Sequence, residues 1–218
     1  MAGATIESLH RYGNAPRLEM TRILVLKSSI MSGKSQTGAL IDDFLAQRQA
    51  LGHRDEIVVR DLASLDLPVL DSELFHALRG AENPGERAGK VVALSDALVA
   101  ELKGSDLLLI GAPMYNLNVP TQLKNWFDLV ARARVTFEYT ATYPRGLVEG
   151  VKAIVFSSRG GVHVGQDTDA VTPYLRAVLG LMGITDVKFV YAEGLDIKPH
   201  GVEAGFASAR EQMQALHA

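Results

Sequence analysis

Five short apolar runs punctuate the chain between residues 22 and 192. They consist mainly of valine, isoleucine and leucine, and most of them do not alternate apolar with polar positions. Unbroken runs of this length are typical of parallel strands that are covered on both faces of a sheet. We therefore expect strands at Arg22–Lys27, Glu56–Arg60, Leu107–Ala112, Val151–Ser157 and Val187–Ala192.

The longer stretches between and after these runs carry apolar residues at helical spacing. In the first stretch, Leu40, Ile41 and Phe44 fall on neighbouring turns, and Gly52 follows as a stop signal. Five strands that alternate with five helices predict right-handed βαβ units in an α/β sandwich of three layers. The helices are expected at Gln36–Leu51, Ala88–Lys103, Gln122–Ala133, Thr172–Met182 and Val202–Leu216.

Two segments interrupt this rhythm. Ala63–Arg87 is too long for a plain connection and contains Pro68 and Pro84, so we expect it to run over the surface. Thr136–Gly150 begins with alternating aromatic residues and ends in proline and glycine, which predicts a small hairpin or flap. Insertions of this kind are frequent positions for a substrate or a partner subunit.

Composition narrows the class of protein. The 218 residues, 47% of them hydrophobic, fit one large α/β domain, although the length alone also permits two small ones. A net charge of −3 gives no excess of basic residues for binding nucleic acid. The absence of cysteine excludes disulfides and fits a reducing cytoplasm. Residues 1–20 lack the apolar core of a signal peptide, so we interpret them as a disordered leader or tag before one domain at residues 21–218. No later segment is apolar for the length of a membrane span.

A polar loop follows the first expected strand. Ser28 and Ser29 lead into a helix that opens at Ser35-Gln36-Thr37. Hydroxyl groups and the free amides of a helix start form an anion site suited to a terminal phosphate. The alternative is that Ser35 simply caps the helix. The fragment Gly33-Lys34-Ser35 is not part of a Walker A motif, because that motif needs glycine where this chain has Ser28.

Two further loops follow the third and fourth expected strands. Pro113–Leu117 offers backbone amides to the polar edge of a flat ring, with the Met114 thioether and the Tyr115 phenol at its sides. Ser157–Gly161 ends in paired glycines, which let the backbone approach a ligand closely. Each loop alone could be an ordinary turn. All three, however, fall at the carboxyl edge of a parallel sheet, where open α/β proteins bind ligands, and together they indicate flavin mononucleotide (FMN).

Several longer motifs carry a resemblance to a known family. They are ILVLKSSI, SQT, VRDLA, PVLD, LSD, APMYN, TQLKNWFDLVARARVTF, SRGG and VTPYLRAVLGLMGITDVKFVYAEG. In these segments the chain resembles the FMN-dependent NADH-azoreductases, also described as FMN-dependent NADH:quinone oxidoreductases. The resemblance implies a flavodoxin-like fold with a five-stranded parallel sheet of order 2-1-3-4-5. It also implies a homodimer with active sites at the interface, which reduces quinones to hydroquinones by two-electron ping-pong transfer and cleaves aromatic azo bonds.

The same resemblance implies roles for individual residues. It places one tightly bound FMN in each subunit, with NADH as the electron donor and NADPH as a possible one. Asn116, Arg79 and Tyr139 would face the substrate, although Arg79 and Tyr139 also fit plain solvated surface positions. The implied cofactor-binding residues are Ser29, Ser35, Gln36, Thr37, Pro113, Met114, Tyr115, Asn116, Leu117, Ser158, Arg159, Gly160 and Gly161.

Other functional classes fit the residues less well. The six histidines are dispersed and no G-x-S-x-G motif is present, so we expect neither a metal site nor a serine nucleophile. A Rossmann dehydrogenase would show G-x-G-x-x-G after its first strand, and a receiver domain would need acidic residues where this chain has Lys27-Ser28-Ser29. The remaining alternative is a flavodoxin-type electron carrier that binds FMN without turning over NADH. Such carriers are usually strongly acidic, unlike this chain.

Overall fold

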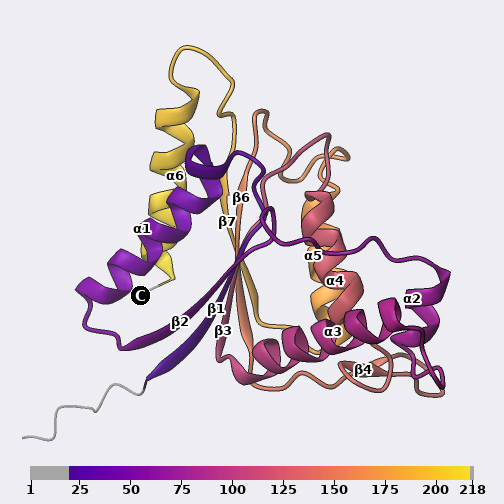
Figure 1. The fold of residues 1–218 in the computed structure, drawn as a ribbon. Helices are drawn as coiled ribbons and strands as arrows, with labels where there is room; N and C mark the ends of the chain where they lie inside the picture. The colour runs from indigo at the N-terminus through magenta and orange to yellow at the C-terminus, as the bar shows by residue number, and fades with distance from the viewer. Residues whose placement is uncertain (1–19, 217–218) are drawn as a thin grey trace, which may run out of the picture.

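The computed structural model describes residues 20–216. The leader or tag expected at residues 1–20, apart from Met20, lies outside the described residues. Five strands form one parallel sheet in the order β2-β1-β3-β6-β7 (Figure 1). Because β6 and β7 are the fourth and fifth strands of this sheet, the order confirms the expected 2-1-3-4-5 arrangement. The strands are β1 Thr21–Lys27, β2 Asp55–Asp61, β3 Leu107–Gly111, β6 Lys152–Ser158 and β7 Val187–Ala192.

Helices cover both faces of this sheet, as the alternating pattern predicts. Figure 1 shows α1 and α6 on one side and α3, α4 and α5 on the other. None of the helices within residues 20–216 has the length and the apolar content needed to cross a membrane. The bounds are α1 Gln36–Ala50, α3 Glu86–Gly104, α4 Thr121–Val130, α5 Val171–Met182 and α6 Gly201–Ala215.

Two hydrophobic cores, one on each face of the sheet, explain the unalternating apolar runs. Along β1, Ile23 and Val25 pack against α1 and α6, whereas Leu24 and Leu26 pack on the other face with residues such as Trp126 of α4. Each of these β1 side chains is at most 2% exposed. Both sets of alternate positions are therefore apolar, as expected for a central strand.

The edge strand β2 departs from the expectation of cover on both faces. Ile57, Val58 and Val59 are 43%, 40% and 49% exposed. The strand pairs with β1 on one side only, because β1 lies between β2 and the rest of the sheet. An apolar run does not by itself distinguish an edge strand from a central one.

The segment Ala63–Arg87 contains a short helix, α2 (Ser72–Ala77), which the sequence did not predict. Asp71 caps this helix, because its side chain accepts a hydrogen bond of 2.9 Å from the Leu74 amide. Leu74 is fully buried, so the segment is anchored in the protein rather than only passing over its surface.

The predicted hairpin in Thr136–Gly150 is present. Its strands are β4 (Phe137–Glu138) and β5 (Arg145–Gly146), which pair antiparallel. Gly146 packs directly on the carboxyl end of α5, where an added Cβ would lie only 2.1 Å from the amide nitrogen of Gly183. In Figure 1, α2 lies at the right and β4 low on the right, whereas the loops that follow β6 and β7 lie at the top.

Candidate functional site

The loops that follow β1, β3, β6 and β7 meet in one pocket at the carboxyl edge of the sheet. Its volume is about 320 Å³, within the range of small-molecule sites. Three of these loops are the ones in which the sequence places a cofactor. The pocket is lined by Ser29, Met31, Lys34, Gln36, Pro113, Met114, Tyr115, Ser158, Arg159, Gly160, Leu195, Asp196 and Val202.

The amino end of α1 supplies unpaired donors to this pocket. Ser35 caps the helix by accepting a hydrogen bond of 2.9 Å from the Gly38 amide, so the simple capping role is real. The amides of Gln36 and Thr37, however, have no partner in the described part of the chain, as is usual in a first helical turn. The exposed Lys34 side chain likewise has no ion-pair partner within residues 20–216. These positive and partly positive groups suit a phosphate.

Two serines connect the first loop to its neighbours. The Ser28 hydroxyl donates to the carbonyl oxygen of Gly111 at 2.6 Å and thereby joins the ends of β1 and β3. The buried Ser29 hydroxyl lies 3.0 Å from the Tyr115 hydroxyl and accepts a hydrogen bond from the Met31 amide. The first and second loops are thus held in fixed relative positions.

The second loop is a tight turn with an unusual backbone. The amide of Tyr115 donates to the Asn118 carbonyl at 2.9 Å, and the Asn118 amide donates back to Tyr115 at 3.0 Å. At the apex, Asn116 and Leu117 have positive φ angles of 48° and 67°. Such angles disfavour leucine and are most often kept at functional positions. Both apex residues are exposed, and neither is among the residues that line the pocket.

The third loop is paired with a fourth segment that the sequence analysis missed. The carbonyls of Arg159, Gly160 and Gly161 accept hydrogen bonds of 2.8–3.1 Å from the amides of Gly194–Asp196. The amides of Gly160 and Gly161 have no partner in the described part of the chain and remain available to a ligand. The segment Leu195–Val202, which lines the pocket, follows β7 at the same carboxyl edge of the sheet. That position is the only sign of it in the sequence, because the segment has no glycine pair and no serine cluster.

The Arg159 side chain differs from expectation. The family resemblance implies that Arg159 binds the cofactor, whereas its side chain is fully buried. Its guanidinium group forms ion pairs with Asp169 at 3.0 Å and with Glu193 at 3.4 Å. The residue lines the pocket, but these charged groups bind each other inside the protein.

Within one chain, the structure does not bring Arg79 and Tyr139 to this pocket. The guanidinium carbon of Arg79 lies 3.6 Å from the centre of the Phe75 ring, and the residue lines a separate pocket beside Asp128. That pocket is at the carboxyl end of α4, which is about 15 Å from its start, near the second loop. Tyr139 is 67% exposed on the hairpin.

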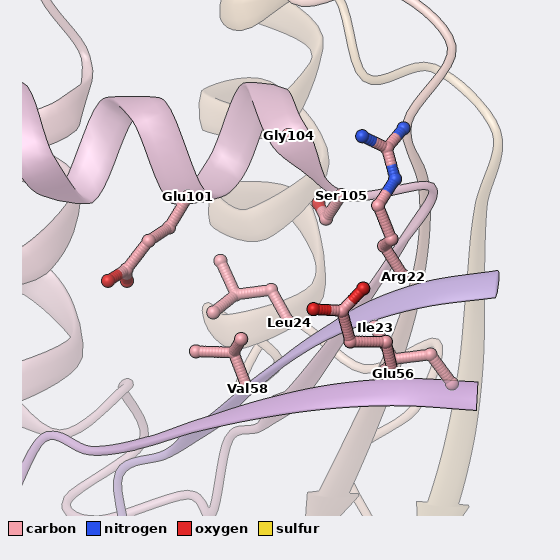
Figure 2. A pocket seen from close by; sticks show the side chains of 8 residues that line it. All are labelled: Arg22, Ile23, Leu24, Glu56, Val58, Glu101, Gly104 and Ser105. Carbon is pink, nitrogen blue, oxygen red and sulfur yellow. The ribbon is translucent and has the colours of Figure 1, made fainter. Parts of the chain in front are cut away.

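A second cavity, of about 150 Å³, opens at the opposite ends of the strands (Figure 2). Leu24 and Val58 form its apolar floor, between β1, β2 and the end of α3. Of the charged groups around it, Glu101 pairs with Arg60, and Arg22 pairs with Asp106. Within residues 20–216, this cavity has no set of unpaired donors that compares with the first pocket.

The groups left unpaired in the first pocket fit FMN. Lys34 and the amides at the start of α1 are suited to the phosphate, whereas the amides of Gly160 and Gly161 are suited to the carbonyl oxygens of the ring. Lys34, Gln36 and Gly160 line the pocket, and Thr37 and Gly161 are the next residues along the chain from Gln36 and Gly160. Met114 and Tyr115 add apolar surface against which a flat ring can pack. A cationic end and an end rich in backbone donors match a ligand that has a phosphate at one end and an isoalloxazine ring at the other. The Asp196 carboxylate also lines the pocket, against Gly160.

Comparisons with known proteins agree with this geometry. A family model described as having a flavodoxin-like fold matches residues 21–216. A Burkholderia lata protein named FMN-dependent NADH:quinone oxidoreductase 4 is 79% identical over 91% of this chain and 100% of its own length. An Aeromonas salmonicida FMN-dependent NADH:quinone oxidoreductase is 58% identical over 90% of this chain and 99% of its own. The crystal structure of an azoreductase from Bacillus anthracis, 26% identical, superposes with a TM-score of 0.81 over 90% of this chain and 98% of that one.

Proposed function

The chain belongs to the family of FMN-dependent NADH:quinone oxidoreductases, and from this premise we propose that it reduces quinones to hydroquinones with NADH through bound FMN. The observation that carries the proposal is the match across the whole length of the Burkholderia lata relative. The similarity to a solved azoreductase supports cleavage of aromatic azo bonds as a second activity. The unit that carries the activity is residues 21–218, taken as one FMN-binding domain.

Different residues of the pocket bind the two ends of the cofactor. FMN, when bound, supplies the chemistry, because it accepts a hydride and passes on two electrons. Lys34 and the amides of Gln36 and Thr37 bind the phosphate. Donation from the amides of Gly160 and Gly161 stabilises negative charge on the polar edge of the ring. No side-chain nucleophile is needed, and the described residues provide no base paired with a serine at this site.

We also propose ping-pong order, as the family resemblance implies. NADH and the quinone would use the same pocket in turn, so that one leaves before the other enters. Plots of reciprocal rate against reciprocal NADH concentration, at several quinone concentrations, are therefore expected to be parallel. Because the donor is NADH, we place the activity in the cytoplasm.

We also propose that the protein works as a homodimer with its active sites at the interface. Arg79 and Tyr139 lie far from the pocket of their own chain, so they would serve the pocket of the other subunit. Several large apolar side chains are exposed around these insertions and loops, as at protein interfaces. They are Val69, Phe75, Leu117, Tyr139, Tyr143, Val162 and Val164.

An anaerobic titration tests the proposed function directly. The purified, FMN-loaded protein is mixed with NADH while the visible absorption of the flavin is followed. Rapid bleaching that benzoquinone reverses is the expected result. Flavin that binds but stays oxidised with both NADH and NADPH would instead support the electron-carrier alternative. Failure to bind FMN would contradict the assignment of the pocket.

A further inference from the structure

A buried ionic cluster lies directly behind the third loop. The Nη2 atom of Arg159 is 3.0 Å from Oδ1 of Asp169, and its Nη1 atom is 3.4 Å from Oε1 of Glu193. The side chains of Arg159 and Asp169 are 0% and 7% exposed. Charges this deeply buried are retained only when they are paired and hydrogen-bonded. The cluster joins three elements: the end of β6, the segment before α5 and the segment after β7.

Neutral side chains complete the cluster and make it specific for arginine. The Nε atom of Arg159 donates to the Ser157 hydroxyl at 3.2 Å, and Nη2 donates to the Thr172 hydroxyl at 3.0 Å. Thr172 in turn donates to Asp169 at 2.7 Å. The guanidinium carbon also lies 4.8 Å from the centre of the Tyr191 ring. A lysine has neither the forked donors nor the flat face that the five partners of Arg159 use.

The cluster reaches the backbone of the loop through Glu193. Its Oε1 atom accepts hydrogen bonds from the amides of His163 at 2.7 Å and Val164 at 2.9 Å, in addition to the ion pair with Arg159. Removal of the guanidinium group would leave a partly buried carboxylate as the support of that backbone. The far end of the loop therefore depends on the same cluster as its beginning.

What remains unpaired in the loop is informative. Its carbonyl groups from Arg159 to Gly161 are bonded to the segment after β7, and its later amides are bonded to Glu193. The amides of Gly160, Gly161 and Val162 are the backbone donors left over in this loop. The surrounding bonds fix the plane and direction of the Gly160 and Gly161 peptide groups, which lie closest to the bonded Arg159 end of the loop.

We propose that Arg159 is a positioning residue: through its buried contacts with Asp169 and Glu193 it fixes the loop Ser158–Val164 so that the Gly160 and Gly161 amides face the bound flavin ring. This inference rests on the proposed function. It gives Arg159 a different role from a residue that touches the cofactor. Because the loop is ordered before the ligand arrives, binding does not have to supply the ordering free energy.

The test compares Arg159→Met and Arg159→Lys with a matched variant, Arg48→Met. Arg48 forms a similarly buried, two-pronged pair with Asp55, at 2.7 and 2.8 Å, but joins α1 to β2 away from the pocket. Two measurements are made: the dissociation constant of FMN from quenching of its fluorescence, and amide hydrogen exchange of residues 160–164 in the FMN-free protein. Asp169→Asn and Glu193→Gln are measured in the same way, in case Arg159→Met does not fold.

Arg159→Met is expected to weaken FMN binding by about tenfold or more, which corresponds to loss of the ordering contribution. Amide hydrogen exchange of residues 160–164 should be faster in Arg159→Met than in the unaltered protein. Arg159→Lys should restore little of either the FMN affinity or the slow exchange. Arg48→Met should leave both readings unchanged, even if it lowers the melting temperature. Saturation with FMN should still leave an altered flavin absorption spectrum in Arg159→Met, which a general loss of stability would not produce.

Equal FMN affinity and equal loop exchange in the Arg159, Asp169 and Glu193 variants and in Arg48→Met would overturn the inference. Full rescue by Arg159→Lys would also overturn it, because a simple positive charge near the ligand would then suffice. Failure of the unaltered protein to bind FMN would instead overturn the proposed function. Loop exchange in the FMN-free protein would still decide whether Arg159 fixes the loop.

Discussion

Leu117 occupies a backbone conformation that its side chain disfavours. Its φ angle is 67°, in the left-handed region where asparagine and glycine are much better tolerated than leucine. Its neighbour Asn116, at 48°, has a residue type that suits the same region. The Leu117 side chain is 45% exposed, so burial offsets only part of this strain. Strain of this kind is usually kept where it serves a site.

We expect Leu117→Asn to increase the free energy of unfolding of the FMN-free protein by about 1 kcal/mol, through relief of this strain. Urea denaturation followed by circular dichroism measures the change. Leu51→Asn is the matched control, because Leu51 is 58% exposed but has an ordinary φ of −78°. A stability change no larger for Leu117→Asn than for Leu51→Asn would contradict the strain argument.

At the scale of elements, the hairpin β4–β5 packs closely against the end of α5 because Gly146 has no side chain. An added Cβ at Gly146 would lie 2.1 Å from the amide nitrogen and 2.2 Å from the Cα of Gly183, which are backbone atoms that cannot turn aside. The Val148 amide also donates to the carbonyl of Met182 at 2.9 Å. The position of β4 and β5, and so of Tyr139, therefore depends on this close approach.

Gly146→Ala is expected to lower the free energy of unfolding by about 1–3 kcal/mol, as forced overpacking does elsewhere. Gly89→Ala provides the opposite result as a control. Gly89 is inside α3 with no atom within 4 Å of an added Cβ, so alanine there should add about 0.5–1 kcal/mol. Thermal unfolding of both variants measures the difference. Equal stability of the two variants would show that the hairpin does not need the contact.

The cap of α2 should make that helix sensitive to acid. The hydrogen bond from the Leu74 amide, followed by the contact with Arg87, holds the pKa of Asp71 below its usual range. A lowered pKa means that the stabilisation is present above the ordinary carboxyl pKa and is lost as the pH falls through the lowered value. We therefore expect amide exchange in α2, corrected for its intrinsic rate, to rise below about pH 4.

Asp71→Asn separates the charge from the cap, because asparagine caps a helix about as well as aspartate. Its α2 exchange should be nearly independent of pH over the same interval. Helix α1 of the same samples is an internal control, since its cap is the Ser35 hydroxyl, which does not titrate there. Acid-induced exchange that is as large in α1 as in α2 would indicate global unfolding rather than loss of this cap.

For the whole molecule, the apolar runs predicted the five strands of the sheet, because runs covered on both faces leave a clear signal. The strand order followed from the family resemblance and not from these runs. It missed α2, whose six residues are too few to show a period and lie in a segment with two prolines. It grouped the first three loops by their place at strand ends, and the structure brings residues from each of them into one pocket. It could not find the partners of Arg159, since Asp169 and Glu193 are 10 and 34 residues away and no periodic pattern connects them.

Arg79 and Tyr139 provide a test of the assembly as a whole. If they serve the pocket of the partner subunit, an Arg79→Ala/Tyr139→Ala chain and a Gly160→Val chain should each be inactive alone. Unfolding and refolding them together should then restore activity, because a mixed dimer has one site built entirely from unaltered halves. Random pairing makes half of the dimers mixed, so about a quarter of all sites should work.

Size-exclusion chromatography confirms that dimers re-form, and the two variants refolded separately and then mixed are the control. No recovery in re-formed dimers would mean that each pocket works with residues of its own chain.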